Sequence, residues 1–332
     1  MAVVGAGIAG LTTAALLAAR GYRVVVVERD VHPGGCAAGF TRDGYRFAVG
    51  ATVATGFERG GLHRRIYDHL GLEPRYVNVS PALRVHLPDR VVRVMTERPA
   101  WEAELARVFP GQELAKRAFW RHLARLADGM YHAATRFPVM PFTSWCDLAD
   151  TARAVHPRLL PLLFLHDGGN LLVSTSPYWD RSRAPEGKRA VNVSTHGDAE
   201  RWMALDKASY ESEKRYMEDC MLSTIEQLWP KVKSGIEVFM SGSPRTFHNF
   251  TRRLGGTVGG TPQVHGHSNF AATSHRSDVR GLFLAGDTVF PGQGTIGVTV
   301  SGYNAARSAA RYLSSVSKAP IAPPRHPKEA KS

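Results

Sequence analysis

The chain begins with MAVVGAGIAGLTTAALLAARGYRVVVVERD, residues 1–30, and this stretch decides the fold class. Residues 3–4 are typical of the end of a strand, residues 9–20 of a helix, and residues 24–27 of a second, fully buried parallel strand. Strand, helix and strand in this order make a βαβ unit, from which doubly wound α/β domains are built. The sequence therefore predicts an α/β fold with a Rossmann-type nucleotide-binding domain.

Gly5, Gly7 and Gly10 form a GxGxxG motif between the first strand and the helix. In this motif the first glycine permits a tight turn, the second lets the backbone approach a pyrophosphate, and the third lets the helix pack close to the strand. The helix N-terminus offers free N–H groups and a positive dipole end to the phosphates. Glu28, at the end of the second strand, can accept hydrogen bonds from a ribose diol and would repel a 2′-phosphate. The complete βαβ context favours a dinucleotide site over an unrelated glycine-rich turn.

A second glycine-rich stretch follows at Gly34 and Gly35, and another small-residue turn comes at residues 50–52, after a strand expected over residues 45–49. NAD dehydrogenases do not need a second loop of this kind. FAD is more extended, and its ribityl chain and ring need a second loop to cover them. The sequence thus favours FAD, although two glycines alone are also compatible with an ordinary turn.

The C-terminal part carries a matching pattern, GLFLAGDTVFPGQGTIGVTVSGYNAARSAARYL, at residues 281–313. We expect a buried strand at residues 282–285, a turn at 291–294, and a helix from Thr295 or Ile296 to about residue 313. Asp287 at the strand end can bind ribitol hydroxyls. The positive end of the helix dipole can stabilise a reduced, anionic flavin.

Together with SPYWDRSRAPEGKRAVNVSTH (residues 176–196) and PRTFHNFTRRLGGTVGGTP (residues 244–262), both terminal motifs resemble FAD-dependent carotenoid desaturases and isomerases of the phytoene-desaturase type. The resemblance implies an FAD-binding domain built from both chain ends, a smaller α+β substrate domain, and oxidoreduction of a long polyene or polyprenoid. Members of that family are longer. Here an apolar helix ending near residue 165 runs directly into HDGGNLLVSTSP, so the chain resembles a member with a central deletion and an incomplete substrate domain.

The resemblance and the motifs together define the expected domains and site. The expected parts are the N-terminal FAD-binding part (1–83), the substrate and helical region (84–240), the C-terminal FAD-binding part (241–313) and a disordered basic tail (314–332). The candidate FAD-binding residues are Gly5, Gly7, Ala9, Gly10, Glu28, Arg29, Gly34, Gly35, Ala51, Thr52, Gly286, Asp287, Gly294, Thr295 and Ile296. No catalytic acid or base can be named, and the histidines have no metal-binding spacing.

Three further elements are expected: a hairpin at residues 84–92, two helices within 101–137 broken at Pro110-Gly111, and one long helix over 199–228. Residues Trp202, Leu205, Tyr216, Met217, Cys220, Met221, Ile225 and Leu228 would share one face of that helix. The face is expected to belong to the core, and part of it could instead line a hydrocarbon tunnel.

The chain of 332 residues has a net charge of +13, with 42 basic and 29 acidic residues. The basic residues are scattered and accompany no nucleic-acid-binding motif, so nucleic acid is not expected as a partner. We expect a cytoplasmic protein, because no segment reads as a membrane span and the three cysteines are far apart. The basic charge and the substrate that the resemblance implies predict peripheral contact with an anionic membrane surface. The oligomeric state stays open.

Two other functions are compatible with parts of the sequence. A non-catalytic remnant could bind flavin or a prenyl or lipid ligand, as prenyl-binding GDP-dissociation inhibitors use this architecture without flavin. The retained AGDTVFPGQG at residues 285–294 argues against a protein that never binds flavin. An NAD-dependent dehydrogenase is disfavoured because it would not need this motif.

Overall fold

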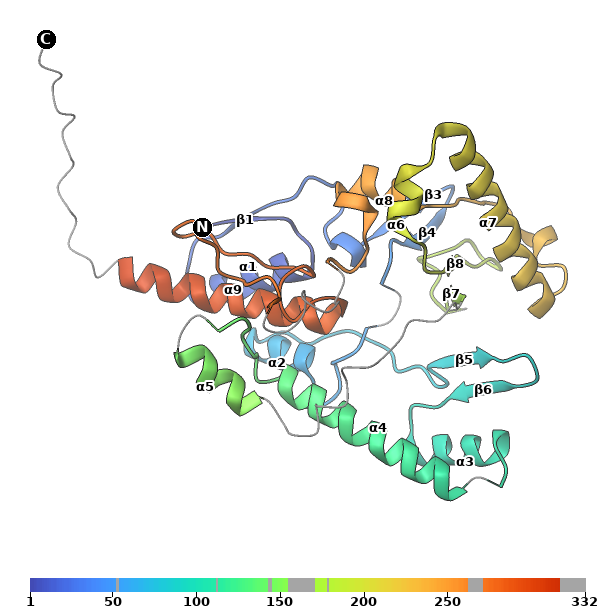
Figure 1. Ribbon diagram of the computed structural model, residues 1–332, viewed down its shortest axis with the longest axis horizontal. Helices are drawn as coiled ribbons and strands as arrows, with labels where there is room; N and C mark the ends of the chain where they lie inside the picture. Colours follow the sequence, from blue (N-terminus) through green and yellow to red (C-terminus); the bar gives the residue numbers. More distant parts are fainter. Residues whose placement is uncertain are drawn as a thin grey trace, which may run out of the picture. The chain divides into compact units, whose positions relative to one another are not determined.

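The computed structural model describes residues 1–51, 54–111, 113–142, 145–154, 171–177, 179–261 and 271–316. The chain divides into two compact units, one formed by Met1–Thr52 with Leu171–Ser332 and the other by Val53–Asn170 (Figure 1). The first unit contains both chain ends and all described candidate FAD-binding residues. Thr52, the expected junction at residues 165–166 and most of the expected basic tail lie outside the described residues.

The predicted βαβ unit is present at the start of the chain. Strand β1 (Ala2–Val4), helix α1 (Ile8–Ala18) and strand β2 (Val25–Val27) follow one another, and the two strands pair in parallel. In this register Ala2 pairs with Val25 and Val4 with Val27. The α/β fold class and the strand–turn–helix context of the glycine motif are confirmed.

The burial predicted for the second strand is wrong. Val25 is 56% exposed and Val27 54% exposed, and Val4 in β1 reaches 88%. Residues 282–285 also do not form the predicted buried strand, since only Phe283 makes an isolated bridge, with Arg276. Parallel sheets are normally covered on both faces by further elements. In the described part of the chain this sheet has only two strands, so its valines stay accessible.

The core of the first unit lies between α1 and α9 (Gly294–Val316), which run side by side (Figure 1). Leu16 and Leu17 of α1 and Val300 of α9 are all fully buried. A Cβ on Gly302 of α9 would lie 2.5 Å from the carbonyl oxygen of Ala9, so the two backbones approach closely at this point. Residues from the two ends of the chain therefore form one hydrophobic core.

Smaller elements complete the first unit. They are the hairpin of β3 (Gly39–Arg42) and β4 (Tyr45–Ala48), the hairpin of β7 (Leu172–Thr175) and β8 (Val191–Ser194), and helices α6 (Ala199–Ala204), α7 (Lys207–Leu228) and α8 (Pro244–Thr251). The strand predicted at residues 45–49 is confirmed as β4.

The single helix predicted over residues 199–228 is divided in two. Leu205 leaves the helical conformation, and the Asp206 carboxylate accepts a hydrogen bond from the Ser209 N–H at 2.8 Å, which caps α7. An aspartate at an N-cap satisfies backbone donors that a continuous helix would not leave free. The predicted buried face is also largely wrong, since Tyr216 is 63% exposed and only Trp202 and Ile225 of that set are buried.

The second unit contains α2 (Leu62–His69), the hairpin of β5 (Leu83–His86) and β6 (Val91–Val94), and helices α3 (Arg98–Val108), α4 (Glu113–Ala134) and α5 (Trp145–Ala154). The hairpin and the two helices separated at Pro110-Gly111 are confirmed. Glu104 is buried and forms ion pairs with Arg93 and Arg107, which hold the pKa of its carboxyl far below the usual range. In the described part of the chain, no helix has the length and apolarity needed to cross a bilayer.

Candidate functional site

The three glycines of the N-terminal motif have three different environments. Gly5 has a φ of +97°, and its N–H donates to the carbonyl of Val27 at 2.7 Å. A Cβ on Gly10 would lie 2.1 Å from the Gly5 carbonyl oxygen, so the turn and α1 fit only with glycine there. Gly7 is different: its φ is −71°, and a Cβ would meet no atom within 4 Å. The fold therefore requires Gly5 and Gly10, whereas Gly7 faces open space.

This open space lies where a phosphate would meet the helix N-terminus. Helix α1 begins directly after Gly7, and no described side chain caps it. The first N–H groups of a helix have no partners within the helix and carry a partial positive charge. The turn can thus hold a pyrophosphate against α1 without moving the backbone.

Glu28 at the end of β2 holds the glycine-rich turn in place. Its Oε2 accepts the N–H of Ala6 at 2.5 Å, and its Oε1 accepts the N–H groups of Arg29 at 2.8 Å and Asp30 at 2.9 Å. The Asp30 and Ala6 N–H groups lower the pKa of Glu28. A carboxylate has about four acceptor positions, so room for a ribose hydroxyl is left. The contact between Glu28 and a ribose remains a prediction. The hydrogen bond by which Glu28 fixes the backbone of the glycine-rich turn at Ala6 is a structural role that the motif alone does not reveal.

The second glycine loop lies directly against the first. Gly34 donates its N–H to the carbonyl of Ala6 at 2.7 Å, and a Cβ on Gly35 would lie 3.2 Å from Cα of Gly7. Ala51 is joined to the same loop, because its N–H donates to the carbonyl of Cys36 at 3.0 Å. The structure thus brings together candidate residues from three separate turns.

The C-terminal motif is fixed from two sides. Gly286 has a φ of +144°, and its N–H donates to the Ser301 hydroxyl of α9 at 3.0 Å. On the other side, a Cβ on Gly260 would lie 2.4 Å from the carbonyl oxygen of Asp287. The backbone at Gly260 therefore packs directly against the backbone of Asp287. The predicted helix is confirmed as α9, which begins at Gly294 and includes Thr295 and Ile296.

Arg253, which no sequence motif identifies, pairs with Asp287 of the C-terminal motif. Its Nη1 lies 2.5 Å from Oδ2 of Asp287, and the Asp287 side chain is only 14% exposed. Cys36 lies within electrostatic range of both charges, and burial raises the pKa of its thiol. Cys36 directly follows Gly35, so the second loop lies against Gly7 and also near the Arg253–Asp287 ion pair. Only long-range packing identifies Arg253, because neighbouring Arg252 looks the same in sequence.

Arg29 lies at the edge of this arrangement. Its guanidinium donates to the carbonyl of Phe250 at 2.6 Å, which ties the end of β2 to α8. Ala9 is buried where α1 meets Gly302 of α9. These two candidates have structural roles here, and contacts of the candidate residues with a cofactor remain predictions.

Comparison with known proteins agrees with this geometry. Residues 3–70 match the family model of the NAD(P)-binding Rossmann-like domain. The chain is 32% identical to the prolycopene isomerase of Daucus carota over 154 residues, which are 46% of this chain and 25% of that protein. It is 34% identical to the zeta-carotene-forming phytoene desaturase of Myxococcus xanthus over 168 residues, 49% of this chain and 30% of that protein. In these two matches the chain spans less than a third of its relative.

A longer match covers almost the whole chain. It is 22% identical to prolycopene isomerase 2 of an Oncidium hybrid cultivar over 498 positions, covering 96% of this chain and 85% of the relative. Because the alignment is longer than the 332 residues of the chain, the relative carries many additional residues inside the matched span. The chain is thus similar to carotenoid desaturases and isomerases, and its residues 3–70 match a Rossmann-like dinucleotide-binding domain.

Proposed function

We propose that the first unit binds FAD, with the pyrophosphate at the Gly5–Gly10 turn and the flavin toward Asp287 and the N-terminus of α9. One observation carries this proposal: the second glycine loop packs against the Gly5–Gly10 turn at Gly7 and Ala6, and its residue Cys36 lies near the Arg253–Asp287 ion pair. A mononucleotide is too short to contact both the Gly5–Gly10 turn and the region of Asp287, whereas an extended dinucleotide can contact both. The carboxylate of Glu28 disfavours a 2′-phosphate, which favours FAD over NADP.

The residues present fit such a group. Gly7 leaves space for a phosphate, the N-terminus of α1 supplies N–H donors, and Arg253, paired with Asp287, places a positive charge at the other end of the path. Bound FAD supplies a two-electron acceptor for a hydride from an allylic C–H bond. The protein orients the substrate and excludes water, and neither task requires an ionisable side chain at the reacting carbon.

The proposed activity is FAD-dependent oxidoreduction of a long polyene or polyprenoid, either carotenoid desaturation or isomerisation. Support comes from relatives whose names describe phytoene desaturases and prolycopene isomerases. A hydrophobic substrate of this size partitions into membranes. Peripheral contact with an anionic membrane is therefore part of the proposal, and the net charge of +13 is consistent with it.

A second candidate is a non-catalytic protein that retains flavin or prenyl-lipid binding without turnover. The accessible valines of β1 and β2 and the additional residues within the matched span of the Oncidium relative favour it. Both observations are consistent with a cofactor site that has lost part of its surroundings.

The cofactor proposal is tested by the visible absorption of the purified chain and by titration with FAD. Gly7→Val is the most informative variant, because the backbone at Gly7 accepts a side chain and a Cβ there meets no atom within 4 Å, so the new side chain enters the space proposed for the pyrophosphate. We expect Gly7→Val to fold normally and to lose at least tenfold in FAD affinity. The matched control is Gly235→Ala, an exposed position where a Cβ also meets no atom within 4 Å. Equal FAD binding by wild type and Gly7→Val would refute the assignment.

Anaerobic bleaching separates the two candidates once FAD is bound. If the protein is an oxidoreductase, adding phytoene or prolycopene without oxygen reduces the flavin or changes the isomer composition of the polyene. If it is a binding remnant, the flavin stays oxidised and the polyene is recovered unchanged.

A further inference from the structure

Two large apolar side chains are exposed at the end of helix α8 in the first unit. Phe250 is 76% exposed and Leu254 is 89% exposed. They flank the turn between α8 and the short 3-10 segment Leu254–Gly256, and we call residues 250–254 the α8 turn. Exposed apolar residues that occur together, with polar residues around them, mark surfaces that contact a membrane or a protein. The α8 turn is therefore a candidate contact surface, and the proposed FAD site does not use these two side chains.

An arginine with a left-handed backbone lies between the two apolar residues. Arg252 has a φ of +58°, and its N–H donates to the carbonyl of His248 at 2.8 Å, which fixes this conformation at the end of α8. Glycine or asparagine usually fills such a position, because a larger side chain strains the backbone there. The side chain of Arg252 is exposed. The fold alone would favour glycine at this position, so the helix end does not account for the arginine.

The carbonyl groups next to the two apolar side chains are already hydrogen-bonded. The carbonyl of Phe250 accepts a hydrogen bond from the guanidinium of Arg29 at 2.6 Å. The carbonyl of Leu254 accepts one from the Thr257 hydroxyl at 3.3 Å. Moving a polar group out of water costs free energy unless the group is hydrogen-bonded. The two side chains can thus enter an apolar layer without leaving these carbonyls unpaired.

The charge of this region is suited to an anionic surface. Residues 238–277 contain no aspartate or glutamate and four arginines, which are Arg245, Arg252, Arg253 and Arg276. Arg253 forms an ion pair with Asp287, whereas Arg252 is exposed between the apolar residues. Arg29, which contacts Phe250, is followed by Asp30, so this edge adds no net charge. The whole chain carries +13, and a net charge of this sign attracts it to anionic surfaces.

We propose that the α8 turn docks the chain on an anionic membrane, with Phe250 and Leu254 entering the boundary of the acyl chains and Arg252 contacting lipid phosphates. This inference rests on the proposed function, because it names the surface through which a protein acting on a membrane-dissolved polyene meets the membrane. Binding of this kind increases with the buried apolar area and with the attraction between basic residues and anionic headgroups. Since Arg253 in the same turn pairs with Asp287, docking here places the Asp287 end of the proposed FAD site near the membrane.

The apolar contribution is tested by flotation of the full chain with vesicles of phosphatidylcholine, alone or mixed with phosphatidylglycerol. We expect the wild type to float with the anionic vesicles, and Phe250→Ser/Leu254→Ser to lose about tenfold or more in its partition coefficient. The matched control is Leu114→Ser/Tyr216→Ser, which removes side chains that are 86% and 63% exposed elsewhere on the chain. Its partition coefficient should change by less than about twofold, because scattered apolar residues are ordinary on protein surfaces.

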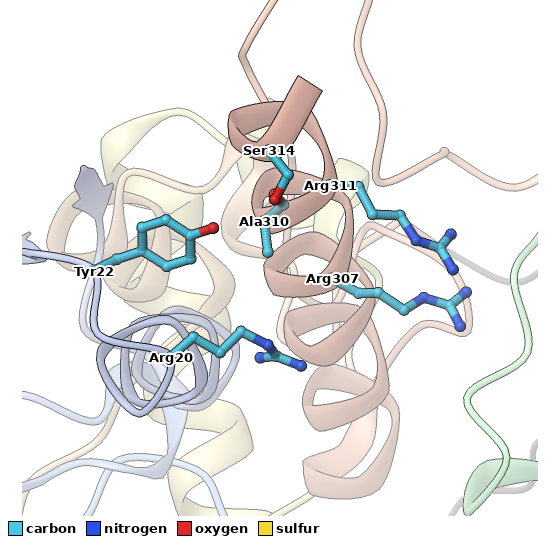
Figure 2. Close-up of a pocket in the computed structure, with 6 residues that line it drawn as sticks. All are labelled: Arg20, Tyr22, Arg307, Ala310, Arg311 and Ser314. Atoms are coloured by element: carbon cyan, nitrogen blue, oxygen red, sulfur yellow. The ribbon is translucent and has the colours of Figure 1, made fainter. Parts of the chain in front are cut away.

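The charge is tested by Arg252→Gly, which preserves the turn because glycine tolerates the left-handed conformation. We expect about a fivefold loss on anionic vesicles. The control Arg311→Gln removes an equal charge from α9, in the groove between α1 and α9, where Figure 2 shows its side chain extending away from Arg20 and Tyr22. This control should lose less than about twofold. Arg252→Lys keeps the charge and should bind like the wild type.

Circular dichroism and FAD titration of each variant separate this proposal from the cofactor assignment. Loss of vesicle binding by the serine double variant, with folding and FAD affinity unchanged, supports the α8 turn as the docking surface. The proposal is overturned if the wild type does not bind anionic vesicles, or if the serine variant binds them as the control does. It is also overturned if sedimentation shows that the turn joins two copies of the chain, with only the serine variant monomeric. Vesicle binding through this turn by a chain that takes up no FAD would refute the cofactor assignment alone.

Discussion

Within the first unit, helix α1 and strands β1 and β2 come from one short stretch of the chain, yet the helix pair α1–α9 and the strand pair β1–β2 differ sharply in burial. Leu16, Leu17 and Val300 of the helices are fully buried, while Val25 and Val27 of the strands are more than half exposed. Each of the two helices buries its apolar side chains against the other, so no further element is needed to cover them. A parallel sheet needs further strands and two covering layers, and the longer relatives have additional residues that could supply them.

The largest expected effect comes from shortening an apolar side chain in the helix pair, compared with the same kind of change in the strand pair. Leu17→Ala deletes a fully buried side chain and is expected to lower the free energy of unfolding by about 2–5 kcal/mol. Val27→Ala, at a position 54% exposed, should change it by less than about 0.5 kcal/mol. Urea denaturation followed by circular dichroism measures both. A loss at Val27 as large as that at Leu17 would mean that the strands are covered in solution, for example by a second copy of the chain.

A smaller effect is expected where the two helices touch. Gly302→Ala puts a Cβ 2.5 Å from the Ala9 carbonyl oxygen, and overpacking of this kind costs about 1–3 kcal/mol. Alanine is favoured over glycine in a helix by about 1 kcal/mol, so a net loss of stability means that the close approach dominates. The control Gly235→Ala has open space and is expected to be neutral within about 0.5 kcal/mol. A Gly302→Ala protein more stable than wild type would contradict the tight crossing.

The same contrast explains which features the sequence could predict. The Gly5–Gly10 turn, α1 and α9 follow from local patterns, because glycine spacing and helix periodicity are properties of consecutive residues. The exposure of β2 and the missing strand at residues 282–285 depend on neighbours that local pattern does not describe. Arg253 could not be assigned for a related reason, since its partner Asp287 is distant in sequence. The break at Asp206 was readable in principle, because an aspartate before a helical stretch is a common N-cap.

The smallest effect is expected at Glu28, which joins the strand side of the unit to the glycine turn. Glu28→Gln leaves one acceptor oxygen for three backbone N–H groups, and we expect a loss of about 1 kcal/mol at neutral pH. The N–H groups of Asp30 and Ala6 lower the pKa of Glu28 in the folded chain, below the ordinary value of 4.5. Its stabilising contribution is therefore complete above about pH 4.5 and disappears as the pH falls through the lowered pKa.

Urea titrations at a series of pH values between about 3 and 7 measure this difference, with Asp43→Asn, an exposed carboxyl in the β3–β4 turn, as the control. The gap between wild type and Glu28→Gln should narrow toward acid pH, whereas Asp43→Asn should follow wild type throughout. FAD affinity gives a second readout, because loosening the turn moves the backbone proposed to hold the pyrophosphate. A stability gap that stays constant with pH would show that the charge of Glu28 does not hold the turn, and that its carboxylate is available for the ribose alone.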